Sequence, residues 1–187
     1  RCRFLDKLHV MDVPLYGSLE EFYSKEHADL AVISSPIQYH AEQTCLALSR
    51  GSFVLCEKPL CATVQEAREI IEAERKFNKW VAVGYQWSFS DAIQLLKKDI
   101  ASGLFGRALR LKTIVLWPRD EKYYKRNSWA GRRQDANGMW VLDSPVNNAV
   151  AHYLHNMFYL LGKAVNESQY PVSVTAELYR ANPIENF

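Results

Sequence analysis

The stretch Phe53-Val54-Leu55-Cys56-Glu57-Lys58-Pro59-Leu60 decides the fold, because a short apolar run ends abruptly on an acid, a base and a proline. Such a run is typical of a buried strand, and the capping box Thr63-Val64-Gln65-Glu66 predicts a helix shortly after it. Lys58 therefore stands at the end of a strand, where open α/β sheets bind their ligands. It is a candidate acid, base or electrostatic group, and the alternative is an ordinary loop ion pair with Glu57.

Strands and helices are predicted to alternate on both sides of this stretch. Continuous apolar runs predict strands, and segments of helical periodicity predict the helices between them. In chain order these elements are residues 29–35, 40–50, 53–56, 64–78 and 80–85, and two short helices are expected before them over 1–9 and 18–23. Short links between such elements are typical of βαβ units, so we predict an α/β fold with a parallel, doubly wound sheet.

The pattern changes after Tyr85, which divides the chain into residues 1–86 and residues 87–187. Apolar and other residues alternate over 108–117 and 172–180, which predicts strands of an open sheet with one covered face. A helix is also expected over 90–102. The second part is therefore predicted to be an α+β domain with a large, mainly antiparallel open sheet.

Residues 118–137 form a long polar and aromatic stretch between these elements, and it contains Tyr123, Tyr124 and Trp129. Loops of this length without regular structure are usually functional, so we interpret it as a functional loop.

A predicted helix near the end of the chain has no charged residue. Ser144 is a typical N-cap and Pro145 a typical first residue, and Gly162 is placed to end the helix. One face of it carries uncharged hydrogen-bonding side chains at i, i+4, i+7 and i+11, namely Asn148, His152, His155 and Tyr159. Because a solvated helix face normally carries charges, this face is predicted to line a pocket.

The two histidines suit proton transfer, since the ordinary pKa of histidine lies near neutral pH. One alternative is a buried helix whose core histidines are hydrogen-bonded. Another is a zinc site shared by His152 and His155, which the lack of a carboxylate or thiol on that face disfavours. We therefore predict no metal.

Composition excludes several classes of protein. The 187 residues are 48% hydrophobic and 24% charged, which is enough for a sizeable core. A net charge of +2 argues against nucleic acid or an anionic membrane as partner, and no apolar run reaches the ~18 residues of a membrane span. The cysteines form no Cys-x-x-Cys motif, which favours free thiols in a reducing cytoplasm over disulfides; they are Cys2, Cys45, Cys56 and Cys61.

Three features together resemble the glucose–fructose oxidoreductase/inositol dehydrogenase (Gfo/Idh/MocA) family. They are the strand end Glu57-Lys58-Pro59, the strand end Ser34-Ser35-Pro36 with His40 behind it, and the helix with Asn148 and His152. Residues 51–59 also match the family pattern Gly-x-x-Val-x-x-Glu-Lys-Pro, and Gly84-Tyr85-Gln86-Trp87 is similar to the family's domain junction. The resemblance implies an NAD(P)-dependent oxidoreductase acting on sugars or polyols, with a Rossmann domain before an α/β domain that carries an open antiparallel sheet.

The resemblance also implies roles for single residues. Lys58 would be the catalytic lysine that stabilises a developing alkoxide, and His152 the general acid/base. Asn148 takes a position usually held by aspartate, as does His155, and an amide can orient an imidazolium but not neutralise it. The nicotinamide of NAD or NADP would lie along Ser35, Pro36, His40, Glu57, Lys58 and Pro59. Candidate substrate-binding residues are Trp87, Trp117, Arg126, Trp129 and His155.

The resemblance covers nearly all of this chain but about the middle half of a family member. Family members begin with a strand, a Gly-x-Gly-x-x-Gly turn and a helix, and this sequence contains no such turn. We therefore expect it to be part of a longer protein. A sugar or polyol substrate and a homo-oligomer formed through the open sheet are the expected partners. The alternatives are a non-catalytic ligand- or partner-binding member and a cofactor-dependent glycosidase or eliminase.

Overall fold

The computed structural model describes residue 11 and residues 13–179. Its first element is α2 (Leu19–Lys25), which begins where predicted, because the hydroxyl of Ser18 accepts a hydrogen bond from the N–H of Glu21. The Glu21 carboxylate accepts from the N–H of Gly17 instead of that of Ser18, so the expected capping box is displaced by one residue. The helix predicted over 1–9 lies outside the described residues.

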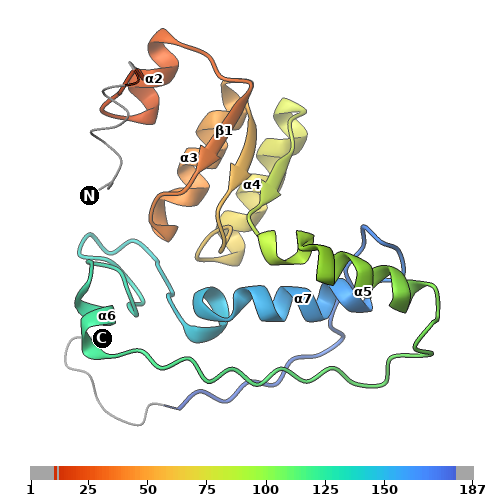
Figure 1. The fold of residues 1–187 in the computed structure, drawn as a ribbon. Helices are drawn as coiled ribbons and strands as arrows, with labels where there is room; N and C mark the ends of the chain where they lie inside the picture. Colours follow the sequence, from red (N-terminus) through yellow and green to blue (C-terminus); the bar gives the residue numbers. More distant parts are fainter. Residues whose placement is uncertain (1–10, 12, 180–187) are drawn as a thin grey trace.

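The sheet of the described chain has three parallel strands in the order β1-β2-β3 (Figure 1). The strands are β1 (Leu30–Ile33), β2 (Phe53–Cys56) and β3 (Val81–Val83), and between them lie the 3-10 turn η1 (Ile37–Tyr39) and the helices α3 (His40–Ser49) and α4 (Val64–Phe77). Ile33 pairs with Cys56 and Cys56 with Val83, so the three strands end level at their carboxyl ends. The predicted parallel α/β architecture is confirmed.

Both crossover helices cover the same face of this sheet. Val54 and Cys56 are fully buried on that face and pack in one core with Leu48 of α3. On the opposite face, Val32 and Leu55 are exposed. Right-handed crossovers between successive neighbouring strands place their helices on one side, so the helices that a doubly wound sheet needs on its second face are not among the described residues.

Local signals set the ends of α4. The hydroxyl of Thr63 accepts from the N–H of Glu66, and the Glu66 carboxylate accepts from the N–H of Thr63. This is the predicted capping box, and it satisfies donors that a helix leaves unpaired at its start. Asn78 ends the helix in the left-handed conformation, with a φ of 51°.

The regular elements of the second part of the chain are helical, and long irregular segments connect them. Its elements are η2 (Gln86–Phe89), α5 (Asp91–Ala101), α6 (Glu121–Lys125), the π-helical turn η3 (Pro145–Ala149) and α7 (Ala151–Leu161). Figure 1 shows α7 lying across the carboxyl ends of the strands. The fully buried Lys97 of α5 donates to the carbonyls of Tyr159, Gly162 and Glu167, which satisfies the end of α7.

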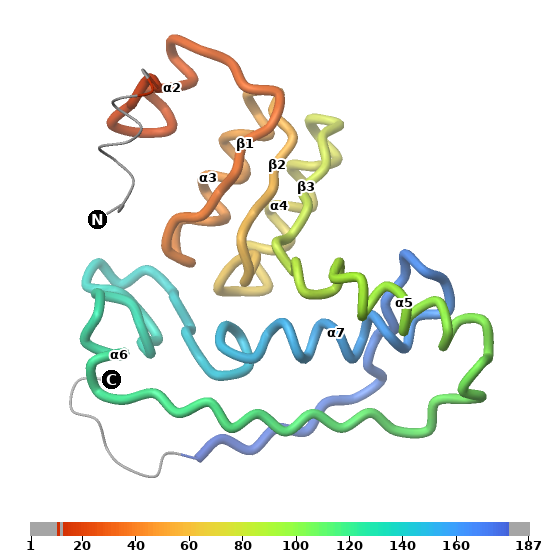
Figure 2. The backbone as a smooth tube through the Cα atoms, viewed as in Figure 1, coloured from red at the N-terminus to blue at the C-terminus, as the bar shows by residue number. Residues whose placement is uncertain are grey.

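The antiparallel sheet predicted for the second part is not confirmed. Residues 108–117 run as an extended segment beneath α7 (Figure 2), and neither they nor residues 172–179 form a hydrogen-bonded strand within the described chain. Alternation predicts which side chains share a face, but a strand exists only where another strand pairs with it. Leu109 and Val172 are strongly exposed as a result.

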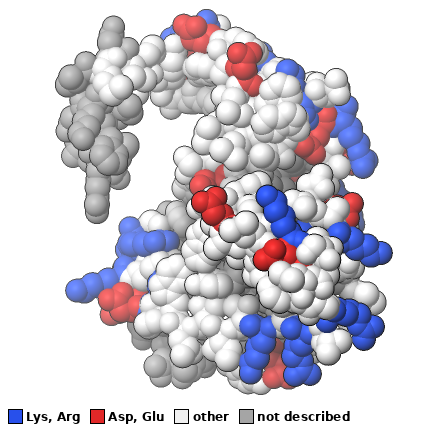
Figure 3. Space-filling model, turned by 45° about the vertical axis from the view of Figure 1, so that its right-hand side comes forward, with Lys and Arg blue, Asp and Glu red and all other residues white. Residues whose placement is uncertain are grey.

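The described surface mixes both signs of charge. On the face shown in Figure 3, lysines and arginines are interspersed with acidic side chains. No helix in the described ranges is long and apolar enough to cross a membrane, and no group of three or more potential metal ligands occurs there. Cys45, Cys56 and Cys61 are free thiols, whereas Cys2 lies outside these ranges.

Candidate active site

Lys58, Trp87 and His152 meet where the carboxyl ends of the strands face α7. Lys58 follows β2, Trp87 belongs to η2 just after β3, and His152 lies in the first turn of α7. The Trp87 ring stacks on the His152 ring at 4.6 Å with an interplanar angle of 14°, and the Tyr85 ring meets His152 edge-on at 5.9 Å. His152 is only 6% exposed, so these aromatic rings enclose it.

The Lys58 ammonium is bound to the second part of the chain. Its Nζ donates to the backbone oxygen of Asn148 at 2.8 Å and to Oδ1 of the same residue at 2.7 Å. An ammonium has three donors, so one remains for a ligand. Burial lowers the pKa of Lys58, and the nearby carboxylates of Glu57 and Asp143 oppose this effect.

His152 is an imidazole whose surroundings favour its neutral form. Burial lowers its pKa below the ordinary value of 6.5, the positive charge of Lys58 lowers it further, and Glu57 acts in the opposite direction. Its Nδ1 is buried and has no hydrogen-bond partner among the described residues. A neutral imidazole beside a cation is suited to accept a proton from a ligand oxygen that the cation also contacts.

The helix predicted over 144–161 is divided just before His152. Ser144 caps it as expected, since its hydroxyl accepts from the N–H of Asn147. The first turn is π-helical, with Val150 N–H donating to Pro145 O at 2.7 Å, and the regular helix starts at Ala151. Such π turns occur frequently at functional sites. Asn148 therefore belongs to a separate turn, and it still lies beside Lys58.

The residues expected on the cofactor side also converge at this edge. His40 joins the ends of β1 and β2, because its Nδ1 lies 2.8 Å from Pro59 O and its Nε2 lies 2.7 Å from Ser35 O. Pro36 caps the turn η1 between them. Glu57 packs against Gly84, where a Cβ atom would lie 3.2 Å from the Glu57 carboxylate.

Residues 4–85 match the model of the oxidoreductase family with an NAD-binding Rossmann fold, Gfo/Idh/MocA. Over these residues the chain matches the Gfo/Idh/MocA family of oxidoreductases. It is 31% identical over 134 residues to 1,5-anhydro-D-fructose reductase of Ensifer adhaerens, covering 71% of this chain and 39% of that protein. It is 29% identical over 157 residues to inositol 2-dehydrogenase of Klebsiella pneumoniae, covering 80% and 42%. The chain thus spans about two-fifths of the length of these curated relatives.

Solved structures extend the similarity beyond residue 85. The WlbA dehydrogenase of Chromobacterium violaceum, solved with NADH and UDP-GlcNAcA, has a TM-score of 0.74 at 25% identity, covering 84% of this chain and 44% of that one. The same values hold for WlbA of Bordetella pertussis, also solved with NADH and UDP-GlcNAcA. The fold of this chain therefore follows that of a solved dehydrogenase through most of the second part.

Two of the expected substrate residues, Trp87 and His155, lie at the site. The His155 ring stacks on Tyr85 at 4.1 Å, and its Nδ1 lies 2.7 Å from the hydroxyl of Ser88. Ser88 gives its single proton to Asn156 Oδ1 at 2.7 Å, so Nδ1 of His155 must be the donor. His155 is thus a packed, hydrogen-bonded histidine, which is the alternative given above for the histidines of this helix face.

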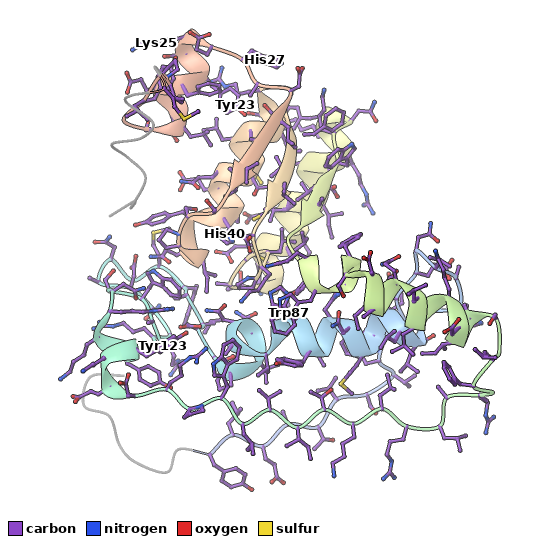
Figure 4. All side chains as sticks on the ribbon, in the orientation of Figure 1. Tyr23, Lys25, His27, His40, Trp87 and Tyr123 are labelled. Carbon is purple, nitrogen blue, oxygen red and sulfur yellow. The ribbon has the colours of Figure 1, made fainter. Side chains whose placement is uncertain are left out.

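The other three substrate candidates lie in a separate arginine–aromatic cluster around α6. The Arg126 guanidinium stands 4.0 Å from the ring centre of Tyr123 and 5.4 Å from that of Trp129, and Trp117 stacks with Arg119 at 4.0 Å. Figure 4 shows Tyr123 on α6, well away from Trp87 and His40. Trp117 and Tyr123 of this cluster line a cavity together with Asp143, whereas Lys58 does not line it.

Sequence reasoning missed Asp143 as a site residue. Its Oδ1 accepts from Asn148 Nδ2 at 2.9 Å, and its Oδ2 accepts from the N–H of Gly131 at 2.7 Å. In the sequence, Asp143 stands directly before Ser144, the predicted N-cap, and the helix pattern predicts no role for it. An acid five residues before an asparagine, directly ahead of the predicted helix, is the signal that could have found it.

Proposed function

We propose that this chain carries the catalytic lysine and histidine of an NAD(P)-dependent oxidoreductase. The reaction is hydride transfer between nicotinamide and a sugar- or polyol-type hydroxyl or carbonyl. The observation that carries the proposal is the Lys58 ammonium, with one donor remaining, beside the enclosed imidazole of His152 at the carboxyl ends of parallel strands. The names of the relatives, an anhydrofructose reductase and an inositol dehydrogenase, support this class of substrate.

The residues at this edge fit a nicotinamide. Of the buried polar side-chain atoms without a hydrogen-bond partner in the described part of the chain, two belong to elements at the carboxyl ends of the strands: Nδ1 of His152 and Oε1 of Gln38 in η1. A polar ligand at this edge would satisfy them. Residues of the loops after β1 and β2, together with the first residue of α3, would hold the nicotinamide of NAD or NADP, namely Ser35, Pro36, Glu57, Lys58, Pro59 and His40. When bound, the nicotinamide accepts or supplies the hydride.

The chain's own residues handle the oxygen and its proton. Oxidation of a secondary alcohol removes a hydride from carbon and a proton from oxygen. Lys58 donates a hydrogen bond to that oxygen and stabilises the negative charge that develops on it. The imidazole of His152 takes the proton, because its lowered pKa keeps it neutral, and returns it in the reverse direction. Trp87 offers an aromatic face to the apolar side of a sugar ring.

In this proposal, the second part of the chain is a substrate-binding and oligomerisation domain, and the domain boundary lies between residues 86 and 87. Residues 108–117 and 172–179 would be strands of its open antiparallel sheet, through which copies of the protein associate. Their exposed apolar side chains, Leu109 and Val172 among them, support this role. The free thiols Cys45 and Cys56 favour a reducing compartment such as the cytoplasm.

Measurements of cofactor binding and of substrate oxidation test the proposal. Binding of NADH and NADPH would be followed by fluorescence, and oxidation of a panel of sugars and polyols by the absorbance of the reduced cofactor. We expect Lys58→Ala to lower kcat by about 10²–10³-fold, because one donor to the developing charge is lost. Exposed Lys98→Ala is the control. Cofactor binding without turnover of any substrate would favour the non-catalytic alternative, and a folded protein that binds neither cofactor would refute the proposal.

A further inference from the structure

A line of hydrogen bonds connects Lys58 to a carboxylate that it does not touch. Lys58 Nζ donates to Asn148 Oδ1 at 2.7 Å, and Asn148 Nδ2 donates to Asp143 Oδ1 at 2.9 Å. We propose that Asp143 is a positioning residue of this site, which fixes the Asn148 amide and through it the Lys58 ammonium. The catalytic consequence of this inference rests on the proposed function, whereas the electrostatic link does not.

The chemistry of the three groups allows one orientation of the amide. An amide has an accepting end and a donating end of nearly equal size, an ammonium only donates and a carboxylate only accepts. Asn148 must therefore turn Nδ2 to Asp143 and Oδ1 to Lys58. Without a carboxylate at residue 143, the amide could turn its NH₂ group toward the ammonium, and Lys58 would lose one of its two acceptors.

Asp143 is itself held from the other side. Its Oδ2 accepts from the N–H of Gly131, a residue in the left-handed region with a φ of 73°. The two carboxylate oxygens thus join the loop over 118–142 to the turn η3 that carries Asn148. Among the described residues, Asp143 forms no ion pair that would neutralise its charge.

The charge of Asp143 also acts on Lys58 directly. Burial lowers the pKa of Lys58, and the carboxylates of Glu57 and Asp143 raise it. The other titratable group beside Lys58 is His152, whose pKa the lysine lowers. An aspartate at position 148 would contact the ammonium itself. Here an amide makes the contact and Asp143 supplies the negative charge one group further away.

The test follows the titration of Lys58 by NMR in protein labelled with ¹³C at lysine Cε. Lys58→Met identifies the resonance. We expect Asp143→Asn to move the midpoint of Lys58 to lower pH, because a negative charge and a fixed acceptor are lost. The control is Asp135→Asn, which removes a carboxylate of the same loop that accepts from the N–H groups of Asn137 and Met139. This control should leave the midpoint where it is in the wild type.

The exchanged pair D143N/N148D keeps the hydrogen bonds and moves the negative charge next to the ammonium. The amide introduced at position 143 would donate to the carboxylate introduced at position 148. That carboxylate would accept directly from Lys58, so the midpoint should rise above the wild-type value. This variant also decides the matter if Asp143→Asn does not fold. The inference is overturned if Asp143→Asn titrates like Asp135→Asn, or if the exchanged pair does not raise the midpoint.

Cofactor binding separates this inference from the proposed function. If NADH binds and sugars are oxidised while Lys58 titrates alike in all variants, the positioning role is wrong and the oxidoreductase proposal stands. If the midpoints move as expected and neither NADH nor NADPH binds, the positioning role of Asp143 stands and the oxidoreductase proposal is wrong. If both proposals are right, Asp143→Asn lowers kcat and the exchanged pair restores part of it, with the binding of NADH unchanged.

Discussion

The two parts of this chain differ in whether their extended segments pair with one another as strands. In the first part, β1, β2 and β3 pair with one another and share a core with α3. In the second part, residues 108–117 and 172–179 run extended and unpaired within the described chain. The packed elements of this part are the helices α5 and α7. The site lies between the two parts, with Lys58 from the edge of the paired sheet and Asn148 and His152 from the helical layer.

This difference indicates where the stability of the chain resides. A buried apolar side chain contributes by the area it removes from water and by its close contacts, and both are concentrated around β2 and α3. An exposed side chain of the same type contributes little. Matched substitutions in the two parts therefore measure the contrast directly.

The largest effect is expected from a pair of leucines. Leu48 is fully buried in α3, whereas Leu109 is 82% exposed. Leu48→Ala should lower the free energy of unfolding by about 2.7–5 kcal/mol, because it removes buried methyl groups and leaves a cavity. In the monomer, where its side chain stays exposed, Leu109→Ala should change this free energy by less than about 0.5 kcal/mol. Urea denaturation followed by circular dichroism measures both, and equal effects would show that residues 108–117 are buried in the protein in solution.

A pair of threonines gives a smaller effect. Thr63 accepts from the N–H of Glu66 at the start of α4, and Thr113 is exposed in the extended segment. Thr63→Ala should cost about 1 kcal/mol of stability, since the helix loses its N-cap. Thr113→Ala should cost a few tenths at most. Denaturation by urea provides the comparison, and a Thr113→Ala cost as large as that of Thr63→Ala would contradict the assignment of residue 113 to an unpaired segment.

The contrast also explains what sequence alone could predict. The strand ending in Glu57-Lys58-Pro59, the capping box at Thr63 and the N-cap at Ser144 were predicted correctly, because short-range chemistry decides them. Sequence reasoning gave the face of α7 that carries His152 and His155, but not the π turn before it, which depends on how η3 packs against the sheet edge. The antiparallel strands were predicted from alternation, which contains no information on pairing.

Those residues of the candidate site could be predicted whose position follows from the sequence pattern of a single strand or helix. Lys58 and the group around His40 converge because they follow β1 and β2, and parallel strands end at one edge of a sheet. Trp117, Arg126 and Trp129 were assigned from residue type alone, and the structure places them in the cluster around α6. The link through Asp143 required the position of the helix layer relative to β2, which sequence periodicity does not provide.

The smallest expected effect is on the titration of His152, and it tests whether the two parts meet at the site in solution. Burial and the charge of Lys58 both lower the pKa of His152. Lys58→Met removes that positive charge, so the midpoint of the His152 ring resonance should move to higher pH while remaining below 6.5, since burial still acts. Exposed Lys98→Met should leave it unchanged. NMR of the histidine Cε1 proton gives both midpoints, with His152→Gln to identify the signal. If His152 titrates identically with and without Lys58, the sheet edge and α7 do not approach each other as described, and a lysine and a histidine so separated could not act on one substrate oxygen.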